Sequence, residues 1–176
     1  FGTTLETIPS SSAYLRADPV RVQSWRERLP QTGKRVGLVW AGNPIQIVDR
    51  YRSIGLAPLA PLLARKDIHW IGFKPELEPH EAALIAGHSN FTHVQTDLES
   101  VAAILVTLDR FVTTCTSLAH LAGALGVPTI LMASAAADWR WLRDRDDSPW
   151  YDSIRIVRQP TLGDWPSVVA QVNALL

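Results

Sequence analysis

The sequence predicts an α/β protein: a doubly wound, mostly parallel Rossmann-like sheet with helices on both faces. Short apolar runs alternate with helical segments along the chain, which is typical of parallel α/β folds. The apolar runs are nearly continuous, as expected of strands that are buried on both faces. Each connection between them is long enough for a right-handed crossover, and 176 residues fit a single domain.

The elements follow one another in regular alternation. Residues 1–19, rich in Thr, Ser and Pro, are expected to form a lead-in or linker, and residues 20–176 the Rossmann-like domain. The first helix begins at Pro19 with Asp18 as its cap. The expected strands are residues 35–41, 68–73, 91–96, 111–112, 129–132 and 154–158, and the expected helices are residues 19–29, 56–64, 76–86, 98–108, 118–125 and 164–176.

Composition excludes several classes of function. Lys plus Arg equals Asp plus Glu, at 17 each, so nothing indicates a nucleic-acid partner or an anionic membrane surface. No apolar run reaches the roughly 18 residues of a transmembrane helix, and no signal peptide opens the chain, so we expect a cytoplasmic protein. One cysteine excludes an internal disulfide, and five scattered histidines lack metal-ligand spacing. The dinucleotide, serine-hydrolase and Walker A motifs are also absent.

The segment from Arg110 to Ala133 organises the domain. Its sequence is R-F-V-T-T-C-T-S-L-A-H-L-A-G-A-L-G-V-P-T-I-L-M-A, which predicts strand, tight turn, helix and strand. A helix N-terminus offers unpaired N–H groups and the positive end of its dipole, and both favour a bound phosphate. Thr116 and Ser117 could add hydroxyl donors there, and His120 a ring donor. The same pattern also fits an ordinary α/β unit in which Ser117 is an N-cap and His120 is satisfied internally.

Two loops that follow strands carry further candidate ligands. The first strand ends in Gly42-Asn43-Pro44, and the predicted loop of residues 45–53 holds Arg50 and Arg52. In open α/β sheets ligands bind at this edge, where a guanidinium group suits an anionic ligand. Both arginines could equally be solvated. Lys74, just past the second strand, is either a ligand contact or a surface lysine.

Five motifs together resemble the C-terminal half of bacterial glycosyltransferase-like proteins that contain TPR repeats. They are W-A-G-N-P, D-R-Y-R-S-I, T-S-L-A-H-L-A-G-A-L-G-V-P, D-W-R-W-L-R-D-R-D-D-S-P-W-Y and R-Q-P-T-L-G-D-W-P-S-V-V. More distantly, the chain resembles ADP-heptose:lipopolysaccharide heptosyltransferases and O-linked N-acetylglucosamine transferases. The likeness covers nearly all of the chain, and the tryptophan-rich block is its most specific part.

The resemblance implies one half of a GT-B architecture, in which two Rossmann-like domains face a cleft. It implies that this half binds a nucleotide-sugar donor as substrate, with no cofactor or metal, and that the other half and TPR repeats belong to the same protein. Because the chain begins with Phe1, we expect it to be a piece of that protein, inactive alone because the acceptor site and catalytic base lie elsewhere. By position, the diphosphate-binding roles fall on Thr116, Ser117, the Leu118 backbone, His120, and Arg50 or Arg52.

Several positions depart from the family's pattern near the implied sugar. Cys115 stands where the family usually has Asp, and Gln46 and Val48 where it commonly has His and Asn. Gly72-Phe73-Lys74 replaces a Ser-Leu-Gln type of strand end. Two hypotheses follow: the donor-binding domain of a metal-independent glycosyltransferase, or a non-catalytic scaffold or nucleotide-binding module. A flavodoxin-like or response-regulator domain is disfavoured, because its acidic cluster is missing after the first strand.

The remaining candidates for sugar or cleft contacts are Asn43, Lys74, Cys115 and Asp138. Cys115 is either a reactive thiol activated by a helix N-terminus or, as we favour, a buried small residue. The tryptophan block of residues 139–150 either lines the cleft or fastens its loop to the sheet. Within it Trp141 has the pattern of a structural residue, and Asp138 is the better ligand candidate.

Overall fold

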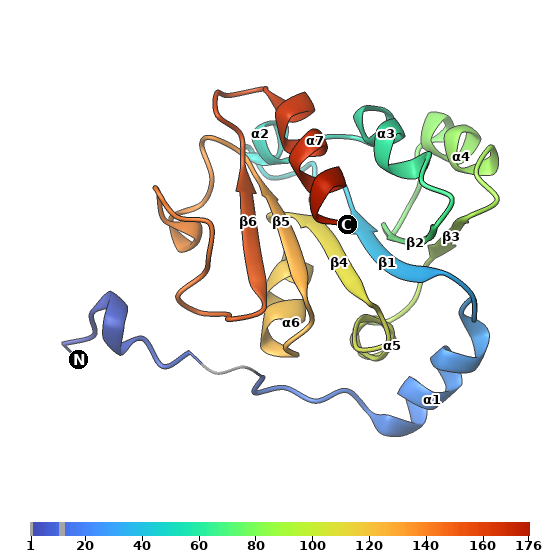
Figure 1. Cartoon of the computed structure of the whole chain (residues 1–176), viewed down its shortest axis with the longest axis horizontal. Coiled ribbons are helices and arrows are strands. Elements are labelled where there is room, and N and C mark those ends of the chain that lie inside the picture. The colour runs from blue at the N-terminus through green and yellow to red at the C-terminus, as the bar shows by residue number, and fades with distance from the viewer. Residues whose placement is uncertain (1, 11–12) are drawn as a thin grey trace.

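A computed structural model of the protein describes residues 2–10 and 13–176. The chain forms a single six-stranded parallel sheet that is covered by helices on both faces (Figure 1). The strand order is β3-β2-β1-β4-β5-β6, and every neighbouring pair is parallel. The predicted fold class is therefore confirmed. The strands are β1 (Lys34–Val39), β2 (Ile68–Phe73), β3 (Phe91–Val94), β4 (Arg110–Thr114), β5 (Thr129–Ala133) and β6 (Ile154–Arg158).

The helices divide between the two faces, and each face has its own apolar core. The first face is covered by α1 (Pro19–Arg28), α5 (Leu98–Leu105) and α6 (Ser117–Ala124), whose apolar side chains pack on Phe111 and Ile71. The second is covered by α3 (Ala60–Leu63), α4 (Pro79–Ala86) and α7 (Trp165–Leu175), packed around Trp40 and Trp70. Burial on both sides explains why the strands are nearly continuous apolar runs.

The structure shortens two of the predicted strands for different reasons. The predicted strand of residues 35–41 ends at Val39, because the Trp40 carbonyl accepts hydrogen bonds from the N–H groups of Ile54 and Gly55 instead of continuing the ladder. The predicted strand of residues 91–96 ends at Val94, which pairs with Phe73, the last residue of β2. As an edge strand, β3 has no second neighbour to extend it.

Helix boundaries differ where prolines and caps intervene. The predicted helix of residues 56–64 is a 3-10 turn, η2 (Ala57–Leu59), followed by α3, and each of these has a proline in its first turn. The helix predicted from residue 76 begins at Pro79, where Glu78 and Glu81 form a capping box. Residues 45–53, predicted as a loop, contain the short helix α2 (Asp49–Arg52). A second 3-10 turn, η3 (Trp139–Trp141), lies in the β5–β6 connection.

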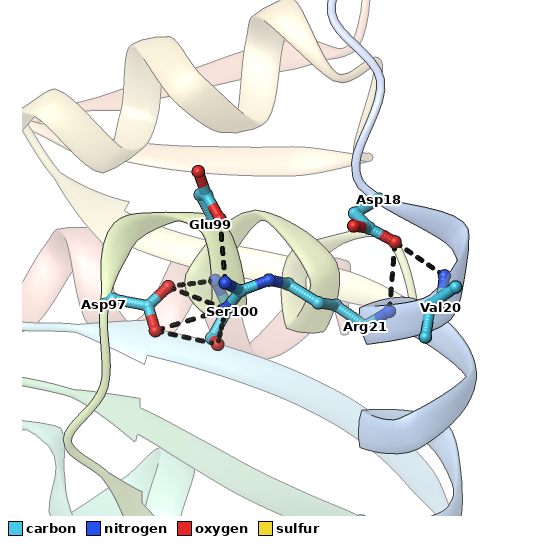
Figure 2. Close-up of polar contacts among 6 residues, drawn as sticks. All are labelled: Asp18, Val20, Arg21, Asp97, Glu99 and Ser100. Carbon is cyan, nitrogen blue, oxygen red and sulfur yellow. Dashed lines mark hydrogen bonds and ion pairs between the residues drawn. The ribbon is translucent and has the colours of Figure 1, made fainter.

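Polar contacts fasten α1 to the start of α5 (Figure 2). The carboxylate of Asp18 accepts from the N–H groups of Val20 and Arg21, as predicted for a cap. The Arg21 guanidinium then reaches both carboxylate oxygens of Asp97, at 3.2 Å each, and Glu99 at 2.9 Å. These bonds place α1 beside α5, although the two helices lie far apart in sequence.

The end of the lead-in lies against α6. The N–H groups of Tyr14 and Leu15 both donate to the Ala124 carbonyl, at 2.9 and 3.0 Å, and an early 3-10 turn, η1 (Leu5–Thr7), precedes them. Residues 1, 11 and 12 of the predicted lead-in are outside the described part of the chain. Across the described residues, no helix is long and apolar enough to cross a membrane.

Candidate functional site at the β4–α6 turn

The turn between β4 and α6 lies where the strand order reverses. The chain moves from β1 through β2 to β3 on one side, then crosses to β4, the other neighbour of β1. Crossovers on opposite faces leave a crevice outside the carboxyl ends of β1 and β4, which is the position at which doubly wound sheets bind ligands. The loops after β1 and β4 therefore form the candidate site.

The N-terminus of α6 lacks the side-chain cap that α1, α5 and α7 have. Asp18, Asp97 and Asp164 accept backbone N–H bonds at the starts of α1, α5 and α7. At the start of α6, Thr116 is extended and makes no such bond, and its hydroxyl lies 3.4 Å from that of Thr113. The first N–H groups of a helix have no intrahelical acceptor. In the part of the chain that the structure describes, the N–H groups of Ser117 and Leu118 therefore have no side-chain cap, and they lie at the start of α6 beside the crevice.

Arg52 links the loop after β1 to this turn. One guanidinium nitrogen, Nη1, donates to the Cys115 carbonyl at 3.0 Å, and Nε donates to the carboxylate of Asp49 at 2.9 Å. Asp49 is buried, and its second oxygen accepts from the Ser53 hydroxyl at 2.8 Å. The Ser53 hydroxyl in turn accepts from the Gly42 N–H. This chain of bonds fixes the Arg52 guanidinium, paired with Asp49, beside the start of α6.

Arg50, the alternative basic residue, is not part of that arrangement. It is exposed, donates to the hydroxyl of Tyr51 at 2.6 Å, and lies over the Tyr51 ring at 4.6 Å. Among the described residues, its guanidinium makes no contact with the β4–α6 turn, so the geometry favours Arg52 as the basic partner of the turn.

Lys74 belongs to a buried network under α4. Its ammonium bonds to Glu81, which is 3% exposed and also accepts from the Trp40 indole at 2.6 Å and the Glu78 N–H at 2.9 Å. Burial acts to raise the pKa of Glu81, but the hydrogen bonds from Lys74 and Trp40 outweigh it and leave the pKa below its ordinary value. The charge of Lys74 is therefore already compensated inside the protein.

The loop after β1 presents apolar side chains on its outer part. The Asn43 side chain accepts from the Ile45 N–H at 3.0 Å and so stabilises the turn after the strand. Ile47 and Val48 are exposed, at 85% and 57%, and Gln46 is exposed beside them. The structure thus assigns Asn43 a local turn contact.

His120 is held by two aromatic residues from the β5–β6 connection. Its ring stacks on Trp141, with centroids 5.0 Å apart and planes 19° apart, and its Nδ1 lies 3.1 Å from the Tyr151 hydroxyl. Burial lowers the pKa of His120, Arg140 lowers it further, and Asp138 opposes them. The neutral imidazole is the form expected near pH 7.

Cys115 is half-buried and contacts Trp141 through its sulfur. The Trp141 indole donates to Sγ at 2.9 Å, and burial raises the pKa of the Cys115 thiol. Both features favour the interpretation as an inert small residue, because a reactive thiolate needs a lowered pKa. Trp141 is fully buried, so its predicted structural role is confirmed.

Asp138 serves η3. Its carboxylate accepts from the backbone N–H and the guanidinium of Arg140, at 3.0 and 2.9 Å. Burial acts to raise its pKa, yet these bonds hold the pKa below the ordinary value. The same connection borders a cavity of about 120 Å³ beside α6, lined by His120, Trp139, Arg140, Trp141, Trp150 and Tyr151. Part of the tryptophan block thus fastens the connection, and part lines this cavity.

Sequence reasoning missed four residues that shape the site: Gly42, Asp49, Glu81 and Tyr151. The signal for Asp49 was present, since its spacing to Arg52 and Ser53 is that of neighbours on one helical turn. The other three act through contacts with distant parts of the chain. Among the described residues, no group of three His, Cys, Asp or Glu side chains could hold a metal ion.

The strand order and the helices on both faces define the fold class, a Rossmann-like α/β domain, and solved glycosyltransferases share this fold. Heptosyltransferase II of E. coli has a similar structure, with a TM-score of 0.67, 16% sequence identity, and 97% of this chain matched to 56% of that one. Heptosyltransferase WaaC of E. coli, solved with ADP, gives a TM-score of 0.60 at 20% identity, with 97% and 52% covered. A family 9 glycosyltransferase from Veillonella parvula gives 0.58 at 14% identity, with 94% and 53% covered.

In sequence, the chain is similar to protein FlbA of Caulobacter vibrioides. The two are 26% identical over 183 residues, which cover 98% of this chain and 30% of FlbA. No protein-family model matches the chain. The chain therefore spans less than a third of that relative and about half of each similar structure.

Proposed function

We propose that this chain is the donor-binding domain of a metal-independent GT-B glycosyltransferase, and that it binds the diphosphate of a nucleotide-sugar at the β4–α6 turn. The observation that carries the proposal is the uncapped start of α6 beside the fixed guanidinium of Arg52, at the reversal of the strand order. The likeness in fold to a heptosyltransferase solved with ADP supports it.

The residues at the turn provide what a leaving diphosphate needs. The N–H groups of Ser117 and Leu118 and the helix dipole attract its oxygens, while Thr116 and His120 add side-chain donors. Arg52 adds a guanidinium whose charge is partly compensated by Asp49, and as leaving-group charge develops these groups stabilise it without a metal ion. One N–H of Arg52 already donates to the Cys115 carbonyl, so this bond holds the guanidinium in position before a ligand binds.

The rest of the protein belongs to the same proposal. The matched structures are roughly twice as long as this chain, so a second Rossmann-like half would complete the cleft and carry the acceptor site and catalytic base. TPR repeats in the same cytoplasmic protein would then present the acceptor. In this arrangement the nucleotide-sugar is a substrate, and no cofactor is required.

Calorimetric titration of the chain with UDP, ADP and GDP tests the proposal. Ser117→Pro removes one N–H while keeping the helix start, because proline suits the first helical position and Thr116 is already extended. Arg52→Ala removes the charge, and Arg50→Ala is its matched control. A charge-assisted bond contributes about 1.5–3 kcal/mol, so one nucleotide should bind about 10- to 100-fold more weakly to the first two variants, and normally to the control.

Two outcomes would contradict the donor-site proposal. One is the absence of binding for all three nucleotides by the folded chain, and the other is binding that neither Ser117→Pro nor Arg52→Ala weakens. Either result would favour the second candidate function, a non-catalytic scaffold. That candidate is supported by Cys115, whose thiol is occupied by Trp141 where the resemblance implies an acidic sugar contact.

A further inference from the structure

His120 is held in one orientation by residues that follow β5. Trp141 stacks on one face of the imidazole, and the Tyr151 ring lies tilted at 60° to it with a centroid distance of 5.7 Å. The Tyr151 hydroxyl lies 3.1 Å from Nδ1. Among the described residues, the other ring nitrogen, Nε2, has no hydrogen-bond partner. The two ring nitrogens therefore have different environments.

We propose that Tyr151 is a positioning residue, whose hydroxyl donates to His120 Nδ1 and so fixes the imidazole as the Nε2–H tautomer, a neutral donor for the diphosphate. The purpose assigned to that donor rests on the proposed function, whereas the tautomer itself does not.

The direction of the hydrogen bond follows from the chemistry of the two groups. A neutral imidazole nitrogen is a far better acceptor than a phenolic oxygen, and a phenol is a far better acid than a neutral imidazole. The O–H···N arrangement is thus preferred over N–H···O. Burial is the main cause that raises the pKa of Tyr151 to about 12. The phenol consequently keeps its proton throughout the range in which His120 titrates.

Gly123 makes the placement of Tyr151 possible. A Cβ atom at Gly123 would lie 2.6 Å from Cδ1 and 2.9 Å from Cβ of Tyr151, so the tyrosine packs directly on the backbone of α6 one turn after His120. Glycine inside a helix is destabilising relative to alanine. The close approach of Tyr151 gives this glycine a structural reason.

Burial has the largest influence on the pKa of His120, and two nearby charged groups add smaller shifts. Arg140 and Asp138 face it from the β5–β6 connection, and they shift its pKa in opposite directions. Tyr14 of the lead-in influences Tyr151. The pKa of Cys115 is raised, so this residue stays a neutral thiol. Because burial keeps His120 neutral, the position of its single proton determines which nitrogen can donate to a ligand.

Nitrogen-15 NMR of histidine-labelled protein tests the tautomer without any ligand. We expect the His120 signals, assigned with His120→Gln, to show the Nε2–H form in the native protein. Tyr151→Phe should shift them toward a mixture of tautomers, and Tyr51→Phe, a matched surface change, should leave them unchanged. An Nδ1–H form in the native protein, or identical signals in Tyr151→Phe, would overturn the proposal.

Calorimetry with the best-binding nucleoside diphosphate then tests the purpose. Losing one net hydrogen bond corresponds to an affinity about three- to tenfold weaker in Tyr151→Phe. Gly123→Ala should weaken binding similarly, because it displaces Tyr151 while keeping the hydroxyl. A confirmed tautomer with unchanged affinity in both variants overturns the assigned purpose. Absence of binding to the native protein instead contradicts the proposed function and leaves the tautomer result standing.

Discussion

Replacing Asp49 should destabilise the protein more than an ordinary surface change, because its carboxylate anchors Arg52. The two side chains are only 11% and 18% exposed, and Asp49 accepts one bond from Arg52 and another from the Ser53 hydroxyl. Asp49→Ala removes both bonds and leaves the guanidinium with the Cys115 carbonyl as its partner. From about 1.5–3 kcal/mol for each bond to a charged group, reduced by partial solvation, we expect a loss of about 2–4 kcal/mol in the free energy of unfolding.

Urea unfolding at neutral pH measures this loss, and a double-mutant cycle identifies its cause. Asp49→Asn keeps the shape and one acceptor for Arg52, so it should fall between the native protein and Asp49→Ala. Combined with Arg52→Ala, the alanine variant should show a coupling energy of about 1–3 kcal/mol. Asp147→Ala breaks an exposed ion pair with Arg145 and should have a smaller effect. Additive effects of Asp49→Ala and Arg52→Ala would refute the reasoning.

Two further predictions concern Glu81 and Gly42. The pKa of Glu81 in the folded protein is below its ordinary value. The stabilisation from its network is therefore fully present at a pH above the ordinary pKa, and it is lost as the pH falls through the folded-state pKa. Urea midpoints should accordingly fall less steeply with acidification in Glu81→Gln than in the native protein, and equal slopes would contradict this. A Cβ at Gly42 would lie 2.5 Å from Arg52 Nη2 and crowd Asp49, so Gly42→Ala should weaken nucleotide binding in calorimetry as Arg52→Ala does. Unchanged affinity would show that the position of Arg52 is unimportant.

The fold could be predicted because the information lies in local patterns. The bounds of β2 and β6 follow from apolar runs that burial on both faces requires. The end of β1 could not be predicted, because it depends on Trp40 bonding to a loop more than ten residues away. Contacts of that kind leave no periodic signal in the sequence.

The candidate site was predicted in part for the same reason. A strand, small residues and a helix mark the start of α6 locally, so Ser117 could be singled out from sequence. The sequence alone did not distinguish Arg50 from Arg52. The structure favours Arg52 because it donates to the carbonyl of Cys115, 63 residues further along the chain. Likewise Lys74 was a candidate ligand because its partner, Glu81, lies on the next element. Local pattern thus locates the candidate site, whereas contacts between separate elements decide how each charged side chain is held.

Cys115 shows why an altered residue at the turn is compatible with diphosphate binding. Its carbonyl accepts from Arg52 and its sulfur accepts from Trp141, so one residue joins the loop after β1 to the β5–β6 connection. The carbonyl bond is independent of the side chain, and an aspartate could also accept from the indole. The difference that remains is charge: a thiol with a raised pKa is neutral, whereas a carboxylate would repel the diphosphate. Under the proposed function, Cys115 in place of an aspartate would therefore affect contacts with the sugar and leave the attraction of the helix start for phosphate unchanged.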